Sequence, residues 1–128
     1  MNRPNPNRQT EGGILYRRLV GALLFSLNGL KRAMQEEACQ VQAVIIVPLT
    51  VLGFWLGNDA TEKLLLVVPL LGVFVVELLN TAIEVTVNRI STERHQLSKE
   101  AKDLGSAAVL IAMLIAGLCW LVILLPRV

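Results

Sequence analysis

The chain has 128 residues, of which 54% are hydrophobic and 17% are charged. This apolar excess is too large for an ordinary soluble protein, and the length suits a single domain. The net charge is only +2, which gives no general affinity for polyanions, so no nucleic-acid partner is expected.

The first 13 residues, MNRPNPNRQTEGG, are polar and rich in Pro, Asn and Gly. They lack the apolar core of a signal peptide, and a segment of this composition buries too little apolar surface to fold. We therefore expect residues 1–13 to form a disordered leader, followed by a single membrane domain over residues 14–128.

Residues 14–35 repeat large apolar residues at helical spacing, with basic and polar residues largely on the other faces. The apolar positions are Leu15, Leu19, Leu23, Leu27, Leu30 and Met34. This pattern is typical of an amphipathic helix that lies in the headgroup layer of a membrane. We predict such a surface helix over residues 14–35.

Three apolar stretches follow, at about residues 38–57, 64–87 and 104–125. Each reaches the roughly 20 residues needed to cross a bilayer. A buried core of a soluble bundle is the alternative, but three such helices in so short a chain leave almost no amphipathic partner to cover them. The sequence thus predicts an all-α membrane protein with three transmembrane helices. Small residues in the third, among them Gly105 and Ala116, would let helices approach closely.

Ten of the twelve Lys and Arg residues lie before the first span or in the loop 88–103. Because positively charged segments stay on the cytoplasmic side, we expect the N-terminus and the 88–103 loop in the cytoplasm.

The second span carries carboxylates, which are costly inside a membrane and therefore indicate a functional site. At about 100° per residue, Glu77, Asn80, Glu84 and Asn88 fall on one stripe of a helix. Glu77 and Glu84 are about 10.5 Å apart along the axis, so they cannot both bind one small ion directly. Glu37 lies at the mouth of the first span.

Glutamates with an amide oxygen nearby are typical of a hard-cation site of magnesium type. His95 is the only histidine, so a zinc site made of several histidines is excluded. No standard phosphate-binding loop is present. The residues alone predict a polytopic membrane protein with an acidic, metal-binding site at the cytoplasmic interface, and a small proton-coupled transporter fits this description equally well.

The chain contains the motifs VELLNTAIE (76–84) and AKDLGSAAVLIA (101–112), and STERHQLS (91–98) lies between them. These two motifs strongly resemble the prokaryotic diacylglycerol kinase family. FSLNGLKRAMQEEA (25–38) resembles the family's junction between surface helix and first span. The resemblance extends over about residues 14–125.

This resemblance implies a homotrimer in the bacterial inner membrane, with active sites at subunit boundaries. It also implies transfer of the γ-phosphoryl group of ATP to the hydroxyl of diacylglycerol, with Mg²⁺ as cofactor and phosphatidate as product. Some family members use undecaprenol instead. The polar groups in LLFSLNGLKRA (23–33) favour diacylglycerol, whose ester carbonyls reward polar neighbours.

Matched motif by motif, the resemblance assigns roles to individual residues. It makes Glu77 the catalytic base, supported by Asn80, and it makes Glu37 and Glu84 the magnesium ligands. The implied nucleotide-binding residues are Arg18, Phe25, Glu37, Glu84, Glu93, Arg94, His95, Lys102 and Asp103. The implied lipid-binding residues are Arg18, Ala22, Ser26, Leu27, Glu77 and Ser106. Asn88 departs from the family, which commonly has Asp at that position.

Overall fold

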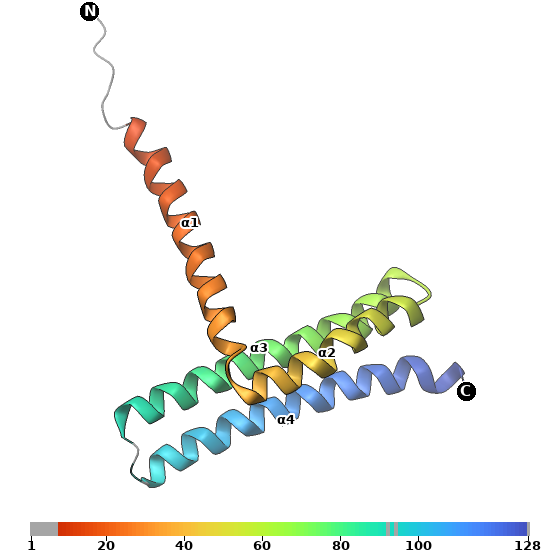
Figure 1. Cartoon of the computed structure of the whole chain (residues 1–128). Coiled ribbons are helices and arrows are strands. Elements are labelled where there is room, and N and C mark those ends of the chain that lie inside the picture. The colour runs from red at the N-terminus through yellow and green to blue at the C-terminus, as the bar shows by residue number, and fades with distance from the viewer. Residues whose placement is uncertain (1–7, 92, 94, 128) are drawn as a thin grey trace, which may run out of the picture. The chain divides into compact units, whose positions relative to one another are not determined.

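The computed structural model describes residues 8–91, 93 and 95–127 (Figure 1). Its elements are α1 (Arg8–Ala33), α2 (Glu37–Leu56), α3 (Ala60–Ile90), α4 (Gln96–Leu124) and a short 3₁₀ helix, η1 (Leu125–Arg127). All of this regular structure is helical, which confirms the predicted all-α class. The chain divides into two units, residues 1–34 and 35–128, and each is described by itself.

The first unit contains α1, which begins at Arg8 and not at residue 14. Residues 8–13, expected in the disordered leader, are therefore helical, while residues 1–7 lie outside the described part. The sequence RQTE supplies good helix formers, which offset the two glycines that follow. The apolar stripe of α1 is largely exposed, as at Leu15, Leu19 and Leu23. An exposed apolar stripe is expected of a helix that lies on a membrane.

The second unit contains three helices that are long and apolar enough to span a membrane, namely α2, α3 and α4. Most of their apolar surface is exposed. A soluble bundle would bury this surface, so the finding confirms the membrane prediction over the alternative of a soluble core.

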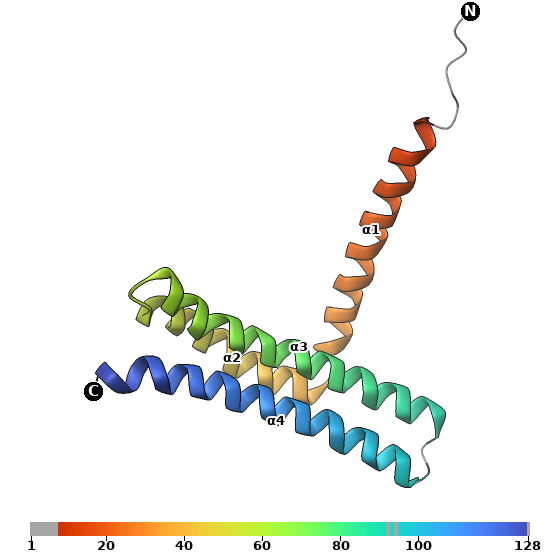
Figure 2. The ribbon, with the colours of Figure 1, turned by 180° about the vertical axis from the view of Figure 1, so that it is seen from behind.

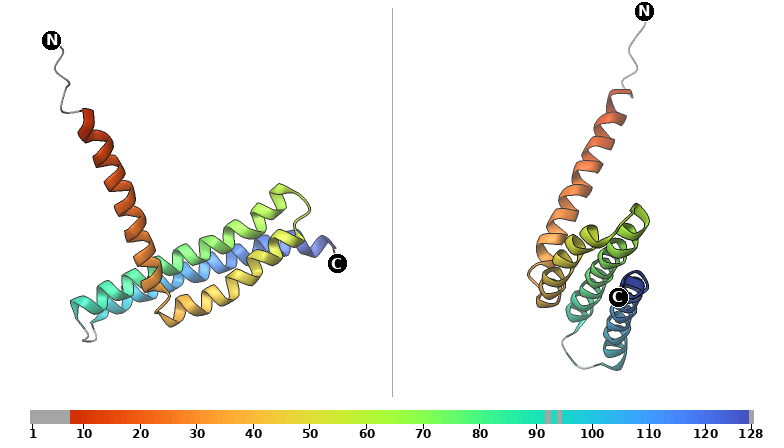
Figure 3. Two further views of the ribbon diagram at one scale, coloured as in Figure 1. Left: turned by 45° about the horizontal axis from the view of Figure 1, so that its top comes forward. Right: turned by 90° about the vertical axis from the view of Figure 1, so that its right-hand side faces the viewer.

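The three helices run antiparallel in sequence, with α3 packed against both α2 and α4 (Figure 2). The α2–α3 turn lies at the same end of the unit as the C-terminus, and the α3–α4 loop lies at the other end. An end-on view shows α3 between its two neighbours (Figure 3). Gly53 permits a close approach of α2 to α3, because a Cβ there would lie 3.1 Å from the Cβ of Leu66.

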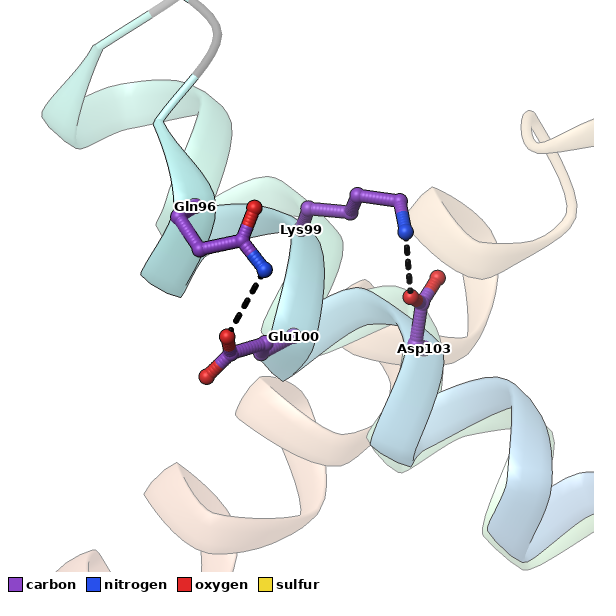
Figure 4. A network of polar contacts seen from close by, with 4 residues as sticks. All are labelled: Gln96, Lys99, Glu100 and Asp103. Atoms are coloured by element: carbon purple, nitrogen blue, oxygen red, sulfur yellow. Dashed lines mark hydrogen bonds and ion pairs between the residues drawn. The ribbon is translucent and has the colours of Figure 1, made fainter.

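The α3–α4 loop is much shorter than the predicted loop 88–103, because α3 continues to Ile90 and α4 already begins at Gln96. Hydropathy detects only the part of a helix that crosses hydrocarbon, whereas both helices extend as polar turns beyond it. Two side-chain contacts, each between residues one helical turn apart, stabilise the start of α4 (Figure 4). Gln96 Nε2 donates to Glu100 Oε1 at 2.8 Å, and Lys99 Nζ lies 3.3 Å from Asp103 Oδ2.

The apolar core lies toward the α2–α3 turn and comprises Ile46, Leu70, Val73 and Ala116. Trp120 packs against it, and its Nε1 donates a 2.9 Å hydrogen bond to the carbonyl oxygen of Leu66. Pro69 lacks an N–H group and so cannot donate a helical hydrogen bond to the carbonyl of Leu65, the residue before Leu66. The indole of α4 therefore adds a donor to α3 next to this missing bond.

Candidate functional site

Two contacts fix how α3 faces its neighbours. Cys39 Sγ of α2 lies 3.3 Å from Thr81 Oγ1, so Thr81 points toward α2. Asn80 Oδ1 lies directly against Gly105 of α4, so Asn80 points toward α4. These two side chains of α3 are about 100° apart around its axis. A side chain of α3 that points between these two directions therefore faces the space between α2 and α4.

Glu77 and Glu84 project into that space, because their positions on the helical wheel fall between those of Asn80 and Thr81. Glu77 is only 4% exposed and Asn80 only 7%, while Glu84 is half-buried. Glu77, Asn80 and Glu84 lie on the same face of α3 as the buried Leu66. The prediction that these polar residues share one face is consistent with their burial.

Glu37 lies in the first turn of α2 and is exposed. It precedes Cys39 by two residues, and Glu84 follows Thr81 by three, so in antiparallel helices the two glutamates lie within about 1.5 Å of the same height. Their directions differ, however. Glu37 is about 200° around α2 from Cys39, and so it points away from α3 of its own chain.

A magnesium ion needs only one or two protein carboxylates when phosphate oxygens supply other ligands. The oxygen donors of Glu37 and Glu84 suit that ion chemically. They do not converge within one chain, and the described residues contain no group of three or more Asp, Glu, His or Cys side chains placed to hold a metal. Glu37 and Glu84, the expected magnesium ligands, therefore lie at about the same height in the bundle but do not meet within a single chain.

A polar cavity of about 530 Å³ lies at the α3–α4 loop. Its lining includes four of the predicted nucleotide-binding residues, which are Glu93, His95, Lys102 and Asp103. Asn88 also lines it, and its Oδ1 accepts a 2.8 Å hydrogen bond from Lys102 Nζ. The structure thus brings these predicted residues together, while Arg94 lies outside the described residues.

His95 has a structural role that the sequence did not indicate. Its Nδ1 accepts a 3.2 Å hydrogen bond from the backbone N–H of Leu97 and so caps the start of α4. In the neutral ring, Nε2 then carries the proton and can act as a donor toward the cavity. Asp103 is exposed and paired with Lys99 at the same end of α4.

An apolar groove of about 240 Å³ lies farther along the space between α2 and α4. Val73 and Leu70 form its floor on α3, Gln42 and Ile46 belong to its α2 wall, and Trp120 lies on α4. Val73 is about one helical turn from Glu77 on the same stripe. The buried carboxylate thus lies between a polar cavity at one end of the bundle and an apolar groove toward the other.

The predicted residues of α1 belong to the other unit and are all exposed. They are Arg18, Ala22, Phe25, Ser26 and Leu27. Ser26 Oγ donates to the carbonyl oxygen of Ala22 at 2.9 Å, so its hydroxyl hydrogen is used within the helix. Ser106 is exposed on α4. Their predicted roles toward nucleotide and lipid remain predictions.

Gly105 contributes more to the site than the sequence indicated. The small-residue pattern predicted a close helix contact, and Gly105 and Ala116 are indeed buried on α4. The pattern could not show that the residue opposite Gly105 is Asn80, because the register between two helices is set by their packing.

Known proteins resemble this chain over most of its length. Residues 24–124 match the family model described as prokaryotic diacylglycerol kinase. The diacylglycerol kinase of Escherichia coli K12 is 41% identical over 110 residues, covering 85% of this chain and 90% of that protein. The diacylglycerol kinase of Haemophilus influenzae is 45% identical over 107 residues, covering 80% and 87%. That of Pseudomonas aeruginosa is 41% identical over 123 residues, covering 95% and 98%. With its three candidate membrane helices, this chain belongs to the prokaryotic diacylglycerol kinase family.

Proposed function

We propose that the protein transfers the γ-phosphoryl group of ATP to the free hydroxyl of diacylglycerol and so forms phosphatidic acid and ADP. The observation that supports this most is the position of Glu77. It is a buried carboxylate between a polar cavity and an apolar groove. A lipid kinase has to bring together a water-soluble donor and a membrane-embedded acceptor, and this arrangement offers a compartment for each.

Glu77 acts as the general base in this proposal. Its carboxylate accepts the proton of the lipid hydroxyl as that oxygen bonds to the γ-phosphorus and the bond to the β-phosphate oxygen breaks. The acyl chains of the lipid extend along the apolar groove toward Trp120. Phosphoryl transfer depends mainly on positioning and charge neutralisation, so a rigid helix face is a suitable support for the base.

The polar cavity holds the nucleotide. Lys102 supplies a cation for the phosphates, and Nε2 of His95 can donate a hydrogen bond. Glu93 and Asp103 are further proposed nucleotide contacts in the cavity. For Arg94, and for Arg18 and Phe25 of α1, a nucleotide contact is proposed on the family resemblance alone. Mg²⁺ would neutralise the charge of the phosphates when bound.

We propose Glu37 and Glu84 as its protein ligands. Because Glu37 points away from its own α3, a second subunit is needed to bring it against Glu84. This requirement supports the homotrimer with sites at subunit boundaries that the family resemblance implies. The exposed apolar faces of α2 and α4 are available for such contacts.

We also propose that the α3–α4 loop faces the cytoplasm of a bacterial cell, with the protein in the inner membrane. The distribution of Lys and Arg supports this orientation, and ATP is supplied on that side. Ala22, Ser26 and Leu27 are proposed lipid contacts on α1. Ser106 is a separate proposed lipid contact on α4.

The acceptor is tested by a direct competition between diacylglycerol and undecaprenol in bilayers that contain the purified protein, with γ-labelled ATP. We expect kcat/KM for diacylglycerol to exceed that for undecaprenol, because specificity is a difference in transition-state stabilisation. A preference for undecaprenol of about tenfold, or about 1.4 kcal/mol, would overturn the acceptor. Label in neither lipid would overturn the kinase itself.

A further inference from the structure

The contact between Asn80 and Gly105 is unusually close. A Cβ built on Gly105 would collide with Asn80 Oδ1 and would lie 3.3 Å from its Cγ. Only a residue without a side chain therefore fits opposite this carboxamide in its present orientation. The next atom, Cδ1 of Ile83, is 3.7 Å away at ordinary contact distance, so Asn80 alone imposes the restriction.

Asn80 Oδ1 is buried and has no hydrogen-bond partner in the described part of the protein. Leaving a buried polar atom unpaired costs about 1–3 kcal/mol, and such exceptions in native proteins call for an explanation. The hydrogen of Gly105 that a Cβ would replace points at this oxygen, which is a weak Cα–H···O contact. This contact orients the group without the strength of a conventional hydrogen bond.

The same contact determines which end of the amide faces α4. With Oδ1 against Gly105, a partial negative charge meets a polarised C–H group, whereas the reverse orientation would press N–H hydrogens against that C–H. The Nδ2 group is consequently turned away from α4. Glu77 lies one turn earlier on α3, on the side toward the space between α2 and α4.

We propose that Gly105 is a positioning residue, which holds the Asn80 carboxamide with its NH₂ group turned away from α4, so that this group can donate to the Glu77 carboxylate and orient that base once the acceptor hydroxyl is bound. This inference rests on the proposed lipid kinase function. Gly105 touches neither substrate, and its effect on the reaction passes through Asn80.

The first test is Gly105→Ala, with Gly72→Ala of α3 as the control, a helical glycine where a Cβ meets no described atom within 4 Å. The obstructing oxygen ends a side chain that can rotate, and alanine favours the helix, so the variant should keep its thermal stability. We expect kcat to fall about tenfold to a hundredfold, with KM for ATP within about twofold of the original. Unchanged kcat in Gly105→Ala would overturn the proposal.

A double-mutant cycle separates this role from simple packing. Asn80→Ala removes the carboxamide, so adding Gly105→Ala to it should cause no further loss of kcat. If Gly105→Ala lowered kcat by the same factor in both backgrounds, its effect would not pass through Asn80, and the proposal would be wrong.

The third readout does not depend on enzymatic activity. In protein labelled with ¹⁵N-asparagine, the side-chain signals of Asn80 are identified by their loss in Asn80→Ala. Gly105→Ala should shift those signals, and Gly72→Ala should leave them in place. Failure of the original protein to phosphorylate any lipid would contradict the proposed function. Unchanged Asn80 signals in Gly105→Ala would contradict the proposed contact between Gly105 and Asn80.

Discussion

The buried stripe of α3 has two halves that differ in chemistry but share one geometry. Toward the α2–α3 turn, Leu66, Leu70 and Val73 pack against α2 and α4. Toward the α3–α4 loop, the same spacing brings Glu77 and Asn80 into the bundle, where Asn80 keeps an unpaired oxygen. The comparison indicates that the apolar half holds the three helices together, while the polar half carries the residues that we propose for the chemistry.

The largest effect is expected in the polar half. Glu77→Gln keeps the shape of the side chain but removes the base, so turnover should fall by about 10²–10⁴. Binding of ATP and the melting temperature should remain close to those of the original protein. Radiolabel transfer measures turnover, nucleotide titration measures ATP binding, and thermal denaturation measures the melting temperature. Retention of most of the rate would show that Glu77 is not the base.

The apolar half should respond in the opposite way. Leu66 is fully buried, and Leu66→Ala should reduce the free energy of unfolding by about 2–5 kcal/mol. The protein that remains folded should keep its kcat. Leu64→Ala is the control, because Leu64 is 61% exposed on the same helix. If the stability of Leu66→Ala matched that of the control, the packing role of this half would be wrong.

The helix boundaries and the stripe show how far the sequence could predict this molecule. Hydropathy located the three spans, and helical periodicity placed Glu77, Asn80 and Glu84 on one face, because both depend on one helix at a time. The extension of α4 back to Gln96 was missed, since its first turns are polar.

The pairings between helices were also beyond the sequence. They depend on register, which is set by contacts such as Cys39 with Thr81 and Asn80 with Gly105. The direction of Glu37 away from α3 follows from the first of these contacts, so periodicity within one helix could not reveal it.

A smaller effect is expected where the polar half meets the proposed second subunit. Glu84→Gln and Glu37→Gln should each weaken the apparent affinity for magnesium by about tenfold, or about 1.4 kcal/mol, because each removes a carboxylate ligand. Titration of activity with Mg²⁺ at saturating ATP measures this. Glu100→Gln is the control, since Glu100 is exposed and bonded to Gln96.

Mixed assemblies of two variants test directly whether Glu37 and Glu84 of one site come from different subunits. If Glu37 and Glu84 act across a boundary, Glu37→Gln chains, which are impaired at limiting Mg²⁺, and inactive Glu77→Gln chains should regain part of the activity at limiting Mg²⁺ when they are co-assembled. Absence of recovery in verified mixed assemblies would place Glu37 and the base in the same subunit.

The smallest effect tests the hydrogen bond in the apolar half. Trp120→Phe removes the donor to the Leu66 carbonyl while keeping an aromatic ring, and should cost about 0.5–1.5 kcal/mol in unfolding free energy. Trp55→Phe is the matched control, because Trp55 is 81% exposed. Equal melting temperatures for the two variants would mean that this bond adds nothing to stability.

The central claim is that the polar half of α3 phosphorylates a membrane lipid at the boundary between the polar cavity and the apolar groove. The most direct measurement is transfer of label from γ-labelled ATP to diacylglycerol by purified protein in bilayers containing Mg²⁺. The account predicts labelled phosphatidic acid from the original protein and almost none from Glu77→Gln at equal folded concentration. Absence of labelled lipid from the original protein, or equal labelling by both, would contradict it.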